Sequence, residues 1–497
     1  MRSRFILPLL LLGAAGNVSI ATAQSPRTFT ATGSMTTARD EHTATLLANG
    51  KLLIAGGYKS TASNSTLTLA SAELYDPSAG TFSATGNMTV ARLLHSATLL
   101  ADGRVLIAGG YSTFPSQQSL ASAELYDPST GTFTATGSMR TAGAGTATLL
   151  ANGTVLIAHD PTFSDNPIAA EVYDPASGTF FATGNQNTNP NDTSQTAALL
   201  PDGGVILVAC CTQIQLYDPA SGAFSLTNVA GLLQNFAQNF DFTMTLLTNG
   251  KLLFSGGCSC EGTPGDPVSA SASLYDPSSG TATATGTMTT PRTLHSATRL
   301  PDGTVLIAGG LKGINSRDFG GTTELYDPAA GTFSRSGDMI TGRYDHSATL
   351  LPDGRVLIAG GLGGLGAAFD YLDSAELYTP PVLVPAPVLF SLSGDGRGQG
   401  AIWDPQTGQI ASAANPASAG DVLSMYTTSL FEGGVIPPQV SIGGQLAEIL
   451  FFGDAPGYPG YFQVNFRMPS GVAPGSAVSV RLTYLGRPSN AVTIGVQ

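Results

Sequence analysis

One pentapeptide that recurs along the chain constrains the fold more than any other feature of the sequence. Glu73-Leu74-Tyr75-Asp76-Pro77 reappears unchanged at residues 124–128 and 324–328, and variants of it occupy residues 171–175, 215–219, 273–277 and 376–380. The tyrosines of these strings are Tyr75, Tyr126, Tyr173, Tyr217, Tyr275, Tyr326 and Tyr378. Their spacing averages about 50 residues, a period that together with strand-like patterning is typical of β-propellers.

Each repeat unit divides into four short strands. In the second unit, the Asp102-Gly103 turn joins residues 95–100 to residues 105–108, and Asp-Gly favours a tight hairpin. Residues 105–108 are all apolar, which predicts a strand buried on both faces. Residues 123–126 and 133–136 are the third and fourth strands, and four strands make one propeller blade. Gly (61 residues) and Pro (31) are abundant, as many turns require.

The two ends of the repeat region complement each other. The last unit ends near residues 378–381 without a fourth strand, whereas residues 28–33 form a spare strand before the first unit. We therefore expect the N-terminal strand to complete the seventh blade and close the ring. Closure would remove the unpaired sheet edges that promote aggregation.

Residues 1–23 have the pattern of a secretory signal peptide. Arg2 and Arg4 precede the apolar residues 5–12, and Ala21-Thr22-Ala23 is a small-residue cleavage site. The apolar stretch is too short to span a bilayer. The sequence thus predicts an exported protein, periplasmic, cell-surface or secreted, with no membrane span. A net charge of −13 argues against a nucleic-acid partner.

The pattern changes after the last repeat. Residues 381–387 are a Pro-rich linker, and residues 388–497 contain six or seven short strands, as in an immunoglobulin-like sandwich. The predicted fold is therefore all-β, with a seven-bladed propeller at residues 24–380 followed by an immunoglobulin-like β-sandwich.

Three motifs carry a resemblance to the kelch-repeat β-propeller family over about residues 27–380. They are Arg-x-x-His at residues 92–95, the double glycine Gly109-Gly110 and Tyr-Asp-Pro at residues 126–128, all of which recur along the chain. Where that family usually carries Trp near the fourth strand, this chain has Phe, at Phe82, Phe133, Phe180, Phe224 and Phe333. The C-terminal segment resembles the TIG-like modules of exported bacterial proteins.

The Arg-x-x-His motifs supply the candidate binding residues. They are Arg39 and His42, Arg92 and His95, Arg292 and His295, and Arg343 and His346. They fall in units that are contiguous around a closed ring, so one arc of the channel mouth would present arginines to a carboxylate or to sugar hydroxyls. The alternative is an ion pair within each blade, such as Arg92 with Glu124. Arg and the third-strand Glu are present or absent together in six of the seven units, which favours the ion pair.

Four cysteines lie in two close pairs, Cys210 with Cys211 and Cys258 with Cys260. Disulfides persist in the oxidising compartments that exported proteins enter. The spacing is not that of paired Cys-x-x-Cys motifs, so no metal site is predicted. A disulfide between neighbouring units, for example Cys211 with Cys258, is one of several possible connectivities.

Two functional interpretations remain. Kelch blades followed by an immunoglobulin-like tail resemble the architecture of galactose oxidase, a family that uses a copper held by two Tyr and two His, with a Cys cross-linked to one Tyr. Its Tyr-His neighbour pair is missing here, because Asp345 separates Tyr344 from His346. The sequence therefore predicts no catalytic residues and no cofactor. It favours a non-catalytic exported binding or scaffold protein, whose variable loops bind a glycan or protein partner. The alternative is a carbohydrate-active enzyme of galactose-oxidase-like architecture.

Overall fold

A computed structural model describes residues 27–497 except 62–64, 114–117, 160–168, 187–194, 210–213, 228–238, 260–267, 314–318, 365–369, 431–436, 457, 459 and 486. The predicted signal peptide therefore lies outside the described residues. Every helix or strand assigned in the described part of the chain is a β-strand, which confirms the all-β class. No helix in that part is long and apolar enough to cross a membrane. The chain divides into two compact units. The first unit comprises Gln24–Val384 and the second unit comprises Pro385–Gln497.

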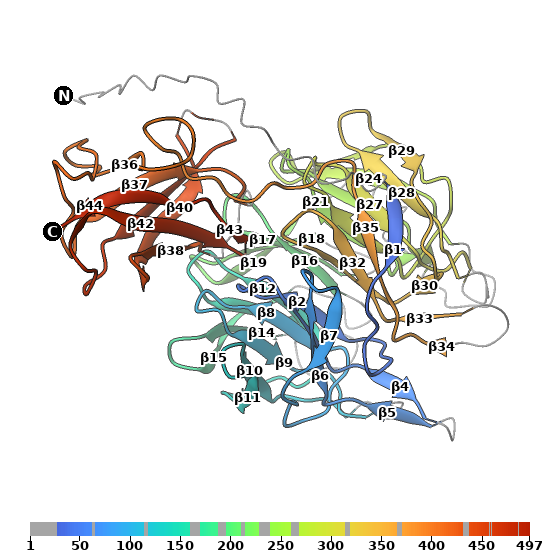
Figure 1. Ribbon diagram of the computed structural model, residues 1–497. Helices are drawn as coiled ribbons and strands as arrows, with labels where there is room; N and C mark the ends of the chain where they lie inside the picture. Colours follow the sequence, from blue (N-terminus) through green and yellow to red (C-terminus); the bar gives the residue numbers. More distant parts are fainter. Residues whose placement is uncertain are drawn as a thin grey trace. The chain divides into compact units, whose positions relative to one another are not determined.

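The first unit is built from four-stranded antiparallel sheets that follow the sequence repeat (Figure 1). The first strands of these sheets are β2 (Thr43–Leu46), β8 (Ser96–Leu99), β12 (Gly145–Leu149), β16 (Gln195–Leu199), β21 (Thr243–Leu246), β26 (Ser296–Arg299) and β31 (Ser347–Leu350). The second strands are β3 (Leu52–Ala55), β9 (Val105–Ala108), β13 (Val155–His159), β17 (Val205–Ala209), β22 (Leu252–Ser255), β27 (Val305–Ala308) and β32 (Val356–Ala359).

The third and fourth strands contain the tyrosine and the phenylalanine of the repeat. The third strands are β6 (Ala72–Asp76), β10 (Ala123–Asp127), β14 (Ala169–Asp174), β18 (Ile214–Asp218), β24 (Ala272–Asp276), β28 (Thr323–Asp327) and β35 (Ala375–Thr379). The fourth strands are β7 (Thr81–Ala84), β11 (Thr132–Ala135), β15 (Thr179–Asn185), β19 (Ala223–Thr227), β25 (Thr281–Ala284), β29 (Thr332–Arg335) and β1 (Thr28–Ala31). The first strand of each sheet contacts the first strands of the two neighbouring sheets, and β31 contacts β2, so the sheets form a closed ring as in a β-propeller.

The N-terminal strand closes this ring, as the sequence predicts. β1 pairs antiparallel with β35, and Phe29 lies opposite Tyr378. Their rings are 5.1 Å apart. Elsewhere the same Tyr–Phe contact forms within one repeat unit, for example between Tyr126 and Phe133 at 4.7 Å.

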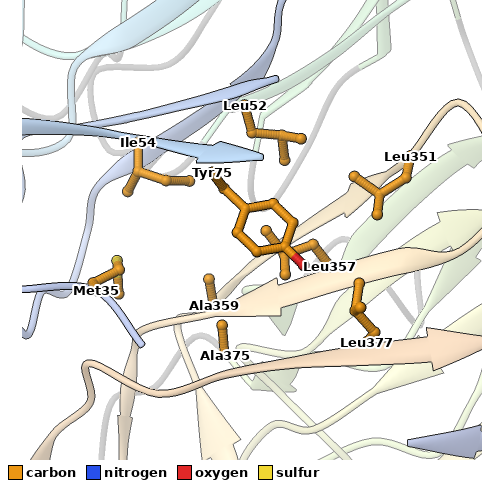
Figure 2. Close-up of a cluster of buried hydrophobic side chains, with 9 residues drawn as sticks. All are labelled: Met35, Leu52, Ile54, Tyr75, Leu351, Leu357, Ala359, Ala375 and Leu377. Atoms are coloured by element: carbon orange, nitrogen blue, oxygen red, sulfur yellow. The ribbon is translucent and has the colours of Figure 1, made fainter. Parts of the chain in front are cut away.

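Apolar side chains fill the space between neighbouring sheets. Figure 2 shows one such cluster, in which Leu52, Ile54 and Tyr75 meet Leu357 and Leu377. The Tyr75 ring is buried, and its hydroxyl forms a 2.8 Å hydrogen bond with the hydroxyl of Thr32. Each buried tyrosine stabilises the fold by roughly 1.5–3 kcal/mol, and its hydroxyl keeps a polar partner.

The second unit also consists of strands. One sheet has the order β36 (Ile402–Trp403), β37 (Val422–Thr427), β41 (Phe462–Arg467) and β40 (Glu448–Asp454). The other has the order β39 (Gln445–Leu446), β38 (Gln439–Ile442), β42 (Gly475–Tyr484) and β43 (Arg487–Pro488), and β44 (Val492–Val496) also pairs with β42. Buried Val440, Val464, Phe466 and Leu482 give this unit its own core. Its immunoglobulin-like topology stays a prediction.

Candidate functional site

The four arginines of the Arg-x-x-His motifs are buried inside the sheets. Arg39, Arg92, Arg292 and Arg343 are at most 1% exposed and form ion pairs of 2.8–2.9 Å with Glu73, Glu124, Glu324 and Glu376. The guanidinium of Arg92 also donates to the carbonyl oxygens of Gly109 and Ser122. Glu124 accepts two backbone N–H groups, from Thr89 and Val90. These contacts are the ion pair within each blade that the sequence analysis gives as the alternative to ligand binding. The role of these arginines in binding stays a prediction.

We call the buried Arg–Glu ion pair and its backbone hydrogen bonds the Arg–Glu clasp. In this clasp, burial and ion pairing have opposite effects on the pKa of the arginine. Burial lowers the pKa of Arg92, whereas the hydrogen bond to Glu124 and its charge raise it. In the third repeat unit His159 takes the place of the arginine and lies 3.2 Å from Glu171. Burial would raise the pKa of Glu171, but hydrogen bonds from His159 and from the backbone of Arg140 and Thr141 lower it.

The four motif histidines join neighbouring sheets. The Nε2 atoms of His42, His95, His295 and His346 lie 2.8–3.1 Å from the hydroxyls of Ser347, Thr43, Thr243 and Ser296, each on the first strand of the preceding sheet or blade. Burial, reinforced by the charge of the nearby motif arginine, lowers the pKa of all four to about 3. They are therefore neutral at physiological pH and act as hydrogen-bonded links.

The cysteine prediction falls mostly outside the described residues. Cys210, Cys211 and Cys260 lie there, whereas Cys258 is buried at the start of β23 (Cys258–Ser259), which pairs with β20 (Asn239–Phe240). The Thr293 hydroxyl donates to its sulfur at 3.7 Å. The disulfide stays a prediction.

The residue that precedes each motif histidine has an unusual backbone conformation. Glu41, Leu94, Leu294 and Asp345 have φ between 49° and 53°, and Asp241 before Phe242 has φ of 54°. Left-handed conformations cost non-glycine residues energy and cluster at functional sites. Two runs of these residues are linked from sheet to sheet. In one, Leu94 N–H donates to the Glu41 carbonyl, and in the other, Leu294 N–H donates to Asp241 and Asp345 N–H to Leu294. We call these five residues the axial ring.

Four carboxyl groups gather at this ring: Asp40, Glu41, Asp241 and Asp345, which we call the axial carboxylates. Asp40 is 1% exposed, and neither of its carboxylate oxygens has a hydrogen-bond partner of normal geometry. Glu41 Oε2 is likewise buried without a partner. Burial, followed by the charge of Glu41, raises the pKa of Asp40 to about 7. Burial, followed by the charge of Asp345, raises the pKa of Glu41 to about 7.

The other two carboxyl groups are also perturbed. Burial raises the pKa of Asp241. Burial, together with the charges of Asp40 and Asp241, raises the pKa of Asp345 well above its usual value. Because the charge of Asp345 acts on Glu41, and the charges of Asp40 and Asp241 act on Asp345, the four groups form one electrostatic unit that extends over three sheets. A carboxyl with a pKa near 7 can both donate and accept a proton at physiological pH.

Three tyrosines border the axial carboxylates. Tyr58 begins β4 (Tyr58–Ser60), which pairs with β5 (Thr66–Thr68), and its backbone pairs with that of Asp40. Tyr344 ends β30 (Arg343–Tyr344), and Tyr371 ends β34 (Asp370–Tyr371), with β33 (Leu362–Gly363) between these two strands. The rings of Tyr58 and Tyr371 meet edge to face at 5.5 Å. Burial and the charge of Asp40 both raise the pKa of each of these phenols, which therefore stay protonated as donors.

The axial carboxylates are not among the residues predicted from the sequence. The Arg-x-x-His motifs draw attention to the Arg and the His and not to the two residues between them. The available signal was the acidic residue at those positions in Asp40-Glu41 and in Asp345. Asp241 lies in a sequence repeat that lacks the Arg-x-x-His motif, so no sequence pattern indicated it.

Comparison with known proteins shows which proteins this chain is similar to. The kelch motif profile matches residues 92–140. Two galactose oxidase sequences from Gibberella zeae are each 26% identical to this chain over 340 residues, which is 67% of this chain and 44% of theirs. The chain therefore spans less than half the length of these curated relatives. A copper-bound fungal alcohol oxidase of the AA5 family has a similar fold, with a TM-score of 0.59, 18% identity, and coverage of 94% of this chain and 98% of the other. The first unit accordingly contains a kelch motif, and its β-propeller fold is similar to that of these oxidases.

These similarities correct the prediction of a non-catalytic binding or scaffold protein, which is wrong. The relatives are oxidases, and the alternative, a carbohydrate-active enzyme of this architecture, fits them better. The prediction failed because it gave the missing Tyr-His pair more weight than the shared architecture. The Tyr-His pair belongs to copper chemistry only, whereas carboxyl groups with a pKa near 7 suit acid–base chemistry.

The copper ligands of that architecture do not fit the residues present. The described residues contain no group of three His, Cys, Asp or Glu side chains placed to hold a metal ion. The second unit has no His or Cys in its sequence. Four of the five histidines are engaged between sheets through Nε2, and the fifth pairs with Glu171. We therefore derive no step through copper.

Proposed function

We propose that this chain is a carbohydrate-active enzyme of galactose-oxidase-like architecture whose chemistry takes place at the axial carboxylates. The observation that carries the proposal is the pair Asp40 and Glu41. Both carboxylate oxygens of Asp40 and Oε2 of Glu41 lack a hydrogen bond of normal geometry, and the pKa values of both groups are raised to about 7. Strongly perturbed carboxyl groups in a cluster are a mark of functional sites.

The residues divide the work as follows. Glu41, which is partly exposed at the axial ring, accepts the proton of a substrate hydroxyl, because its pKa matches the working pH. Burial and the like charge of Asp345 keep the pKa of Glu41 high. The phenols of Tyr58 and Tyr371 share a hydrogen bond, and Tyr58 also bonds Asp40, so these tyrosines fix the carboxyl group of Asp40 beside Glu41. Proton transfer at a hydroxyl belongs both to alcohol oxidation and to glycoside chemistry, so both products are assayed.

We further infer that the first unit is a seven-bladed ring, that the second unit is an immunoglobulin-like sandwich, and that residues 1–23 direct export. The motif of the sequence repeat supports the first inference, the two sheets of the second unit support the second, and the sequence pattern supports the third.

The purified chain is incubated with galactose, primary alcohols and a polysaccharide panel, with and without added Cu²⁺, while peroxide and new reducing ends are measured. Turnover that Glu41→Gln lowers by about 100-fold or more supports the proposal, a size typical of losing a general base. The matched control is Asp202→Asn, an exposed hairpin carboxylate that accepts the backbone N–H of Gly204. No turnover of any substrate, or turnover that Glu41→Gln leaves unchanged, would overturn it.

A further inference from the structure

The sheet formed by β36, β37, β41 and β40 in the second unit has two different faces. Along β41, Phe462, Val464 and Phe466 are buried and belong to the core of this unit. Gln463 and Asn465 alternate with them and are partly exposed. Because successive side chains of a strand point to opposite sides, these two amides mark the outer face of the sheet.

Aromatic side chains from the other three strands share this outer face. Tyr426 on β37 lies opposite Gln463, and Phe451 on β40 lies opposite Asn465. Residues directly opposite each other in an antiparallel pair point to the same side. The ring of Trp403 on β36 contacts that of Tyr426, with 4.9 Å between the ring centres. The three aromatic rings therefore flank the two amides.

The ring of Phe451 lies over a position that has no side chain. A Cβ at Gly453 would be 3.3 Å from Cζ of Phe451, so the glycine leaves room for the ring. Gly453 lies opposite Gln463 and thus belongs to the outer face. Although its ring rests on the sheet, Phe451 is 45% exposed, so a ligand can reach it.

The two amides keep hydrogen-bonding groups for a ligand. Asn465 Oδ1 accepts hydrogen bonds from Ser424 Oγ and from Gln463 Nε2, both at 2.8 Å. Within the described residues, Asn465 Nδ2 and Gln463 Oε1 have no hydrogen-bond partner. The face thus offers a donor and an acceptor between aromatic rings.

This combination suits a sugar better than a protein. The C–H groups of a sugar ring pack on aromatic faces, which carry partial negative charge, while the hydroxyls of the sugar both donate and accept. An apolar protein surface would instead bury Asn465 Nδ2 and Gln463 Oε1 without partners, which costs free energy.

The charge of the face further selects the ligand. The charged side chains that these four strands place on the outer face are Glu448 and Arg467, which pair with each other at 2.8 Å. The face is therefore neutral, in a chain of net charge −13. An anionic polymer would be repelled by the chain as a whole, and a cationic polymer would find no unpaired carboxylate on this face. An uncharged polymer fits best.

We infer that the outer face of this sheet binds a neutral polysaccharide, which packs on Trp403, Tyr426 and Phe451 while its hydroxyls bond Gln463 and Asn465. This binding site belongs to the second unit and does not depend on chemistry at the axial carboxylates. It would hold the enzyme on a polymer.

The first test uses the wild-type chain and needs no variant. Trp403 is the only tryptophan in the sequence, so its fluorescence reports on this face alone. The purified full chain is titrated with hydroxyethylcellulose, xyloglucan and galactomannan, and with polygalacturonate as the anionic comparison. We expect at least one neutral polymer to change the emission saturably and to protect Trp403 from acrylamide quenching. The change should be the same at about 20 and 200 mM salt, a range over which exposed charges become screened.

The second test measures affinity electrophoresis in the polymer that binds. We expect Trp403→Ala and Phe451→Ala each to weaken binding about three- to tenfold, as the loss of an aromatic contact allows, whereas Phe451→Tyr retains it. Leu446→Ala is the matched control, because Leu446 is an exposed apolar residue on β39, in the other sheet of the same unit. Glu41→Gln should bind the polymer as wild type does.

Several results would overturn the inference. They are emission that none of the neutral polymers changes, a preference for polygalacturonate, and binding that Phe451→Ala leaves unchanged. Binding that Glu41→Gln abolishes would assign the polymer to the axial carboxylates instead. Self-association that Phe451→Ala abolishes, without polysaccharide binding, would assign the face to a protein contact. Polymer binding without turnover supports this inference and overturns the proposed function, whereas turnover without polymer binding does the reverse.

Discussion

The Nη2 atom of Arg92 lies 2.8 Å from Oε1 of Glu124, and both side chains are almost completely buried. Arg92 also donates to the carbonyl oxygens of Gly109 and Ser122. It therefore joins the segment before the first strand to the double glycine and to the third strand of the same sheet. The same contacts recur at Arg39, Arg292 and Arg343.

We expect Arg92→Ala to lower the free energy of unfolding by about 3–5 kcal/mol, because it leaves the buried Glu124 carboxylate without its cation. Arg104→Ala is the control, since Arg104 pairs with Asp102 at 2.6 Å on the surface, where such pairs contribute about 1 kcal/mol or less. Chemical denaturation measures both. If Arg92→Ala keeps its stability but loses ligand binding, the arginines are binding residues and not a clasp.

The double glycines make a second prediction. Gly110 has φ of +83°, and a Cβ there would collide with the Leu93 carbonyl oxygen and lie 2.9 Å from His95 Cβ. Gly103 has nearly the same φ, +87°, but nothing lies within 4 Å of its Cβ position. We expect Gly103→Ala to cost about 1–2 kcal/mol of backbone strain, and Gly110→Ala to cost about 1–3 kcal/mol more from overpacking. Thermal and chemical unfolding of the two variants test this, and equal losses would contradict it.

The third prediction concerns pH. The pKa of Glu41 is raised to about 7, so the folded state binds a proton that the unfolded state has lost between about pH 4.5 and 7. Its stabilising contribution is complete below that window and disappears as the pH rises through 7. Glu41→Gln does not titrate, so we expect it to gain stability relative to wild type across this window, by up to about 1.4 kcal/mol per pH unit.

The histidines provide a control of opposite sign. The pKa of His295 is lowered to about 3, so its contribution is complete above pH 6.5 and is lost as the pH falls toward 3. His295→Gln should therefore gain stability relative to wild type as the pH falls from 6.5 to 4. Denaturation curves at matched pH values measure both differences, and parallel curves for the two variants would contradict the assignment.

Much of the propeller could be predicted because the same sequence motifs recur in each blade. Seven occurrences of the tyrosine string or its variants, together with the Asp-Gly turn and the apolar second strand, identify the four-stranded sheets. The Arg–Glu clasp could be inferred because the two residues occur together. Glu41 and Asp345 could not be recognised in this way, because their significance lies in a left-handed backbone and in proximity across the ring. Proximity between residues some 300 positions apart leaves no local pattern.

The pairing of β1 with β35 determines how the propeller carries load. Thr28 lies opposite Thr379, so both ends of the propeller segment leave the ring at the same end of one four-residue pairing. A tension between these ends pulls the two strands apart one hydrogen-bonded pair after another and does not slide them along each other. The ring thus opens at this seam before any blade is stretched, and refolding must bring the two ends of the propeller segment together again, a search over nearly its whole length that slows folding.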